Sequence, residues 1–141
     1  MEKKKVIAEI QNYLGQELSD LAQTLENPAS LSAEKAQAIA ARVDEIKQQL
    51  IMYKFLPVRP FTSEDVICPG GLVELQLNQM RAYYLIVPKG GGLVTRVEGQ
   101  AVQVITPNSP LGEALLGKKV GDSAQVEIGG KTRDYKVVGY F

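Results

Sequence analysis

The sequence predicts an α+β protein in two parts: an N-terminal antiparallel two-helix coiled-coil hairpin, then an antiparallel β domain with one short helix. Three observations support this prediction. Residues 1–57 contain two apolar stripes at helical spacing, on either side of a proline-containing turn. Residues 66–141 contain short apolar runs separated by glycine-containing turns, which is typical of strands. A short apolar segment between Pro110 and Gly117 predicts the single helix of the β domain.

The N-terminal hairpin is predicted from the spacing of the two stripes, whose members recur every three or four residues. Pro28 biases the residue before it away from helical geometry, and Ser32 is a good N-cap for the second helix, so the helices fold back on each other. An isolated hairpin buries little area, so it either projects freely or packs on the β domain or on a second copy. The stripes are Ile7, Ile10, Leu14, Leu18, Leu21 and Leu25, then Ala36, Ile39, Val43, Ile46, Leu50 and Tyr53.

A linker is predicted over residues 58–65, because Pro57 and Pro60 break the helical pattern. The β domain then begins near Val66. A continuous apolar run at residues 82–87 indicates a central strand, in which neighbouring residues point to opposite faces of the sheet. The expected strands are residues 72–77, 82–87, 93–97, 102–105, 124–128 and 135–140.

The composition limits the chemistry. The sixteen basic and sixteen acidic residues divide evenly between residues 1–60 and 61–141, which disfavours autonomous nucleic-acid binding. The chain has no histidine and a single cysteine, Cys68, which excludes histidine-based acid–base catalysis, Cys/His zinc sites and intramolecular disulfides. The charged start, with Lys3 to Lys5 as a solvated helix end, indicates no signal peptide or membrane span, so a cytoplasmic protein is expected.

The stretch from Ile105 to Asp122 is the most specific motif. Pro107 and Pro110 end a strand and begin the short helix, Gly117 ends that helix, and a Gly-Asp turn leads into the next strand. With the hairpin that follows, residues 102–141 resemble the C-terminal domain of the bacterial transcript-cleavage factors GreA and GreB, and of their shorter relative Rnk. The resemblance implies an FKBP-like β domain behind an N-terminal coiled coil.

The resemblance also implies a partner. Gre factors dock on RNA polymerase and insert their hairpin into its secondary channel, so RNA polymerase is the expected partner of this chain. The docking loop in GreB-type sequences carries Asp-Ser-Pro, and the corresponding residues here are Asn108, Ser109 and Pro110. Because asparagine and serine before a proline are also good helix caps, capping is an equal and compatible interpretation of this loop.

Catalysis in Gre factors needs carboxylates at the hairpin tip that hold Mg²⁺ beside the polymerase's own ion. The family pattern is Asp-x-x-Glu-Asn, whereas this chain has Glu26-Asn27 preceded by Asp20 six residues earlier. Glu26 and Glu34 are the nearest available pair of acids. We therefore expect a Rnk-like accessory factor that is not itself an enzyme, has no cofactor of its own and occupies the channel without cleavage. The alternative is a true cleavage stimulator that acts at the polymerase's Mg²⁺ site.

A rival function from another class is an FKBP-type prolyl isomerase or peptide-binding module on the same fold. Such a pocket is lined by several aromatic side chains. The chain has no tryptophan, and its three phenylalanines lie at positions 55, 61 and 141, which argues against this function.

Overall fold

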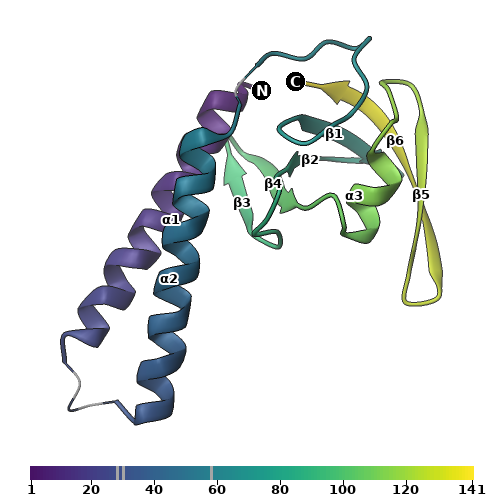
Figure 1. Ribbon diagram of the computed structural model, residues 1–141. Coiled ribbons are helices and arrows are strands. Elements are labelled where there is room, and N and C mark those ends of the chain that lie inside the picture. Colours follow the sequence, from purple (N-terminus) through teal and green to yellow (C-terminus); the bar gives the residue numbers. More distant parts are fainter. Residues whose placement is uncertain (28, 30, 58) are drawn as a thin grey trace. The chain divides into compact units, whose positions relative to one another are not determined.

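The computed structural model describes residues 1–27, 29, 31–57 and 59–141. The chain divides into two compact units, residues 7–56 and residues 1–6 with 57–141. Two helices are followed by a six-stranded sheet with one short helix, which confirms the predicted fold class (Figure 1). The first six residues group with the C-terminal unit, although the sequence alone placed them in the hairpin. Within the described residues, no helix is long and apolar enough to cross a membrane.

The helical unit is built from α1, Lys3–Leu25, and α2, Ala33–Phe55. Every residue of the two predicted stripes is buried or half-buried, which confirms the seam. The Ser32 hydroxyl caps α2 by accepting a hydrogen bond from the Lys35 N–H at 3.2 Å, also as predicted. A bidentate ion pair joins the helices, since Arg42 donates to the two carboxylate oxygens of Glu17 at 2.9 and 3.2 Å. The predicted turn residue Pro28 lies outside the described residues.

The sheet has the strand order β3-β4-β2-β1-β6-β5. Four of its neighbouring pairs are antiparallel, but β2 and β4 are parallel, so the sheet is mixed and the expectation of a purely antiparallel sheet is corrected in this one pair. The reason is the β3–β4 hairpin: β3 takes the edge, and β4 returns beside β2 in the same direction. The strands are β1 Leu72–Leu77, β2 Met80–Ile86, β3 Val94–Val97, β4 Gln100–Ile105, β5 Ser123–Ile128 and β6 Lys131–Tyr140.

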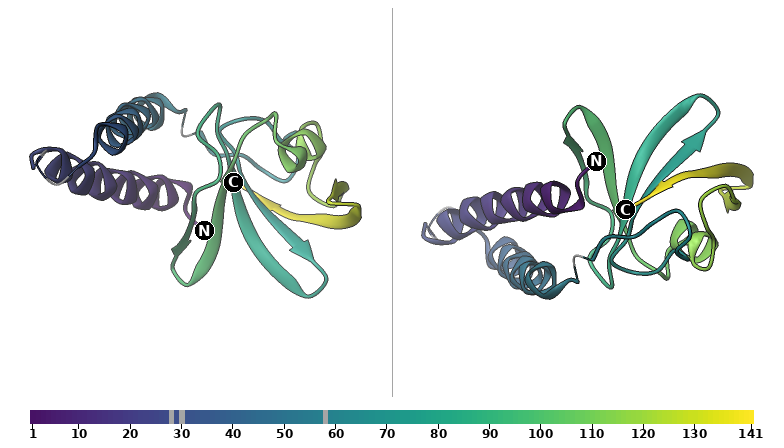
Figure 2. Two further views of the ribbon diagram at one scale, coloured as in Figure 1. Left: turned by 90° about the horizontal axis from the view of Figure 1, so that it is seen from below. Right: turned by 90° about the horizontal axis from the view of Figure 1, so that it is seen from above.

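The short helix α3, Pro110–Leu115, covers part of the sheet and lies beside the β5–β6 hairpin in both views of Figure 2. Leu111 and Leu115 anchor it in the core, together with apolar residues of β1, β2, β5 and β6. Gly117 follows the helix at φ +84°, a left-handed conformation that glycine adopts readily and that ends helices. This helix therefore begins and ends as its proline and glycine predict.

The start of α1 joins the C-terminal unit through Lys3, which is 7% exposed and not solvated as the sequence suggested. Its Nζ donates to the main-chain oxygens of Arg59, at 2.6 Å, and Phe141, at 3.3 Å. It also lies 4.4 Å from the ring centre of Phe61, which stacks on Tyr140. Burial lowers the pKa of Lys3, because removal from water disfavours the charged ammonium. Two main-chain oxygens and the face of the Phe61 ring take the place of water around the ammonium group.

Candidate functional site

The loop between β4 and α3 is held by its own side chains. The Ser109 hydroxyl accepts a hydrogen bond from the Gly112 N–H at 3.1 Å and donates one to the main-chain oxygen of Thr106 at 2.6 Å. Ser109 is thus the N-cap of α3, followed by Pro110 at the first helical position. The capping interpretation is confirmed, and capping fixes the direction in which Pro110 and Leu111 point.

Gly112 allows this loop to close against the helix. A Cβ at this position would overlap the main-chain oxygen of Thr106 and would also lie 2.9 Å from the Ser109 hydroxyl. Any larger residue would therefore have to push the loop away from the first turn of α3. The glycine in the Ser-Pro-x-Gly segment is required by this close approach of two main-chain segments.

A groove of about 270 Å³ lies beside the loop. Tyr84 and Tyr135 meet there nearly at right angles, with ring centres 6.4 Å apart. Burial raises the pKa of the Tyr84 hydroxyl, with a smaller contribution from Tyr135. Among the described lining residues Arg133 is the one charged side chain, so the walls are otherwise apolar or neutral. The lining consists of Tyr84, Gln103, Ile105, Ser109, Pro110, Leu111, Ile128, Arg133 and Tyr135.

The structure brings two of the three predicted docking residues to this groove. Ser109 and Pro110 line it, while Asn108 lies exposed next to it and accepts a hydrogen bond from the Thr106 hydroxyl at 2.7 Å. Sequence reasoning missed Arg133 and Tyr135, because they come from β6 and reach the groove only through sheet pairing. Tyr84 had a signal in the sequence: it neighbours Tyr83 in one strand, so the two side chains had to face opposite sides.

The predicted tip acids lie at the two sides of the hairpin turn. Glu26 directly follows α1 and Glu34 is in the first turn of α2, and both are exposed. Positions 28 and 30 between them are outside the described residues. In the part of the chain that the structure describes, no three His, Cys, Asp or Glu side chains gather closely enough to hold a metal ion. A role for Glu26 and Glu34 stays a prediction.

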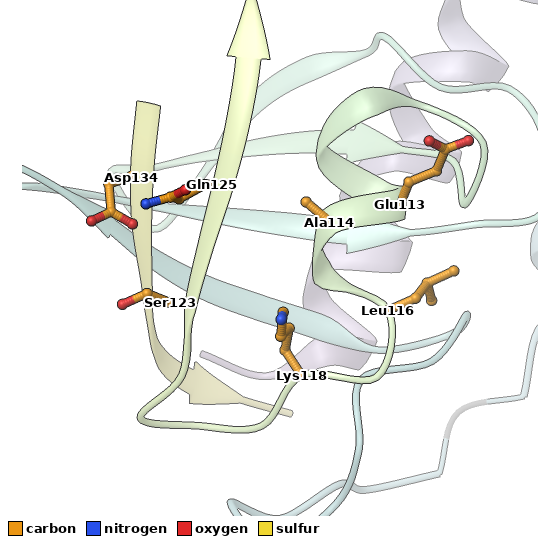
Figure 3. Close-up of a pocket in the computed structure, with 7 residues that line it drawn as sticks. All are labelled: Glu113, Ala114, Leu116, Lys118, Ser123, Gln125 and Asp134. Atoms are coloured by element: carbon orange, nitrogen blue, oxygen red, sulfur yellow. The ribbon is translucent and has the colours of Figure 1, made fainter. Parts of the chain in front are cut away.

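A second recess lies beside α3, lined by residues of α3, of the turn that follows it, of β5 and of β6 (Figure 3). It shares none of its lining residues with the groove beside Ser109. The two recesses therefore define separate surfaces of the same unit.

The family comparison covers this unit. The model of the C-terminal domain of transcription elongation factors GreA/GreB matches residues 63–139, more than half of the chain. The matching model describes the C-terminal domain of transcription elongation factors, so this unit is the C-terminal domain of a protein of that class. The chain belongs to the GreA/GreB family.

Individual relatives are more distant. Transcription elongation factor GreA of Clostridium perfringens is 49% identical over 35 residues, so the match spans 25% of this chain and 22% of that relative. GreA of Syntrophus aciditrophicus is 22% identical over 124 residues, 86% of this chain and 71% of the relative.

Among solved structures, GreA factor homolog 1 (Gfh1) of Thermus thermophilus aligns with a TM-score of 0.44 at 19% identity, covering 96% of this chain and 92% of Gfh1. The GreA/GreB factor of Nitrosomonas europaea aligns with a TM-score of 0.41 at 20% identity, covering 79% of this chain and 94% of that one.

Proposed function

We propose that this protein docks on bacterial RNA polymerase at the secondary channel and modulates elongation by occupying the channel with its hairpin, without stimulating transcript cleavage. The observation that supports docking is the groove beside α3, where Ser109 and Pro110 of the family-like loop meet two tyrosines and an arginine. Tyrosine and arginine are the residue types enriched at the energetic centres of protein interfaces. The groove thus suits an apolar side chain of a protein partner that carries an acidic group near Arg133.

The absence of cleavage is proposed from the hairpin tip. Hydrolysis by two metal ions requires oxygen ligands that hold a second cation beside the polymerase's own Mg²⁺. Asp20, the acid at the wrong spacing, accepts a hydrogen bond from the Gln16 amide at 3.0 Å, one turn earlier on α1. Glu26 and Glu34 are the nearest pair of acids at the tip, and the chain lacks the family's aspartate three residues before Glu26.

Docking is tested by co-purification with core RNA polymerase. Replacing Ser109 and Pro110 together by alanine also removes a cap, so Arg133→Ala is the cleaner variant because this side chain is exposed. We expect Arg133→Ala to weaken binding roughly tenfold, the cost typical of an interface arginine. Lys131→Ala is the matched control, since Lys131 is exposed on the same strand but outside the groove, and it should leave binding unchanged. Failure of the parent protein to bind polymerase would refute the proposal.

Cleavage is tested in a backtracked elongation complex. The protein should compete with an authentic Gre factor and yet release no short 3′ RNA fragment by itself. Fragment release that disappears in Glu26→Ala or Glu34→Ala, with binding retained, would show the opposite and would assign those carboxylates to metal binding.

A second candidate function is peptide binding or prolyl isomerisation in the same groove. It is favoured by one observation: although no phenylalanine lines the groove, Tyr84 and Tyr135 do. Turnover in a proline-peptide isomerisation assay, lost in Tyr84→Ala, would support this candidate over polymerase docking alone.

A further inference from the structure

One edge of the sheet, formed by β5, leaves main-chain groups unpaired. The β5–β6 hairpin has a two-residue turn, Gly129-Gly130, with φ of +60° and +79°, and Ile128 pairs with Lys131 across it. The residues that flank such a turn form a hydrogen-bonded pair, and pair types alternate along an antiparallel ladder. The alternation holds at the far end, where the Val137 N–H donates to the Asp122 oxygen at 2.9 Å. Even-numbered residues therefore bond to β6.

It follows that Ser123, Gln125 and Glu127 direct their N–H and C=O groups away from β6, toward the open edge. All three residues are exposed. The main-chain hydrogen bonds that β5 forms outside its ladder, within the described part of the chain, include none from these three. A strand that presents such a row of free groups is a template for another strand.

The space beside this edge is open. A groove of about 550 Å³ lies between α3 on one side and the outward side chains of β5 and β6 on the other, lined by Glu113, Ala114, Leu116, Lys118, Ser123, Gln125 and Asp134 (Figure 3). The α3 residue that points toward β5 is the small Ala114. A recess of this volume is far larger than one water molecule, so it is filled by solvent that an added strand can displace.

The charges along this edge change sign from one end to the other. The side chains of Ser123, Gln125 and Glu127 lie on the face of the hairpin that points away from the core. On this face the register places Ser123 beside Lys136, Gln125 beside Asp134 and Glu127 beside Thr132. Lys136 and Glu127 are both exposed, and neither forms an ion pair with another described residue. The edge is therefore basic at its Ser123 end and acidic at its Glu127 end.

We propose that β5 pairs antiparallel with β5 of a second copy of this chain, centred on Gln125. In this arrangement Gln125 faces its own counterpart, and Ser123 faces Glu127 of the second copy. Lys136 then lies two strand spacings, about 9.6 Å, from that Glu127 across the short serine, within reach of the two long side chains. The two-fold symmetry repeats the pair, so two Lys136–Glu127 ion pairs accompany about six main-chain hydrogen bonds.

Other pairings fit less well. A parallel pairing through the same edge turns the second copy over, so Lys136 of one copy and Glu127 of the other lie on opposite faces and form no ion pair. The opposite edge, β3, has four residues and directs only Val94 and Arg96 outward, by the same alternation from the Glu98-Gly99 turn. A second copy bound through β5 is thus the occupant that matches the edge's length, direction and charge.

Sedimentation equilibrium of the full chain tests the proposal. Interfaces of this small size are weak, so we expect a dimer with a dissociation constant on the order of 100 µM at low salt, weakened by added salt. Glu127→Lys and Lys136→Glu should each weaken the dimer roughly tenfold or more, because each replaces both ion pairs of the dimer by two like charges. The double variant, Glu127→Lys with Lys136→Glu, should restore it, which a general loss of folding would not do.

A second pair of variants tests the main-chain hydrogen bonds between the two β5 strands. Gln125→Pro removes one outward N–H without removing any bond to β6, and it should abolish the dimer. Gln125→Thr keeps that N–H on a good strand former and should leave dimerisation within about twofold. A protein that stays monomeric at millimolar concentration and low salt, or a dimer unaffected by both Gln125→Pro and the charge reversals, would overturn the proposal.

Discussion

The two units differ in how deeply they bury their apolar residues. Among the residues that the structure describes, the C-terminal unit has a core cluster of twelve buried residues, in which Leu115 and Val137 are fully inaccessible. Along the hairpin, Ile10 and Ile46 are fully buried, whereas Leu21, Leu25 and Ala36, closer to the turn, are only half-buried. Burial in the helical unit thus declines toward its turn.

This difference in burial indicates which part of the molecule opens most easily. The turn end of the hairpin is held by half-buried apolar residues, so it opens at lower free-energy cost than the sheet and α3, whose buried residues share one core cluster. The groove beside α3 is accordingly held rigidly. Under the proposed function, the hairpin tip needs to be neither deeply packed nor fixed in a single conformation.

The largest expected contrast comes from one truncation in each unit. Leu115→Ala should lower the free energy of unfolding by about 3 kcal/mol, since it leaves a cavity under α3. Leu21→Ala removes the same atoms from a half-buried site and should cost about 1 kcal/mol. Urea unfolding followed by circular dichroism measures both, and equal losses would contradict the difference in packing.

High pH should act on the hairpin through Tyr53. Burial raises the pKa of this hydroxyl to about 12, compared with about 10 in the unfolded chain. Between these two values the unfolded state has released the proton and the folded state has not, so stability falls as pH rises from 10 to 12, by at most about 2 kcal/mol. In Tyr53→Phe this part of the decline should vanish. Parallel curves for the two proteins over that range would show that Tyr53 ionises freely.

The two helix caps offer a matched comparison. Ser32→Ala removes one hydrogen bond at an exposed helix start and should cost about 0.5–1 kcal/mol. Ser109→Ala removes two hydrogen bonds at a half-buried helix start and should lower the free energy of unfolding by about 1–2 kcal/mol. Thermal unfolding of the two variants decides the order, and a larger loss for Ser32→Ala would reverse our ranking of the caps.

The smallest effect is expected at the ion pair across the hairpin. Glu17→Gln should lower stability by about 0.5 kcal/mol at low salt, because both partners are about one-third exposed and water screens them. High salt should reduce the difference further. A loss that does not respond to salt would indicate that packing of the Arg42 stem, and not charge, is what matters.

The sequence predicted best what is local. Alternation marked β1 with its observed bounds, and the serine caps and Gly117 marked the helix ends, because each depends on a few neighbouring residues. The parallel β2–β4 pair, the burial of Lys3 and the entry of Arg133 into the groove depend on residues far apart in the chain. The hairpin tip differs from both groups. Its family pattern, Asp-x-x-Glu-Asn, involves only neighbouring residues, but the chain matches it only in part, so the sequence did not determine the chemistry of the tip.

The contact of Lys3 with Phe141 has a consequence for synthesis. The two residues are separated by 138 positions, and the Lys3 ammonium bonds to the main chain at Phe141. The hairpin has all of its residues once position 56 has left the ribosome, and the contacts within it are short-range, so it can form early. The C-terminal unit has to wait for its last strand, and Lys3 lacks its hydrogen bond to Phe141 until that strand has been synthesised. Translation speed through β6 therefore sets how long the nascent chain exposes an unfinished sheet edge.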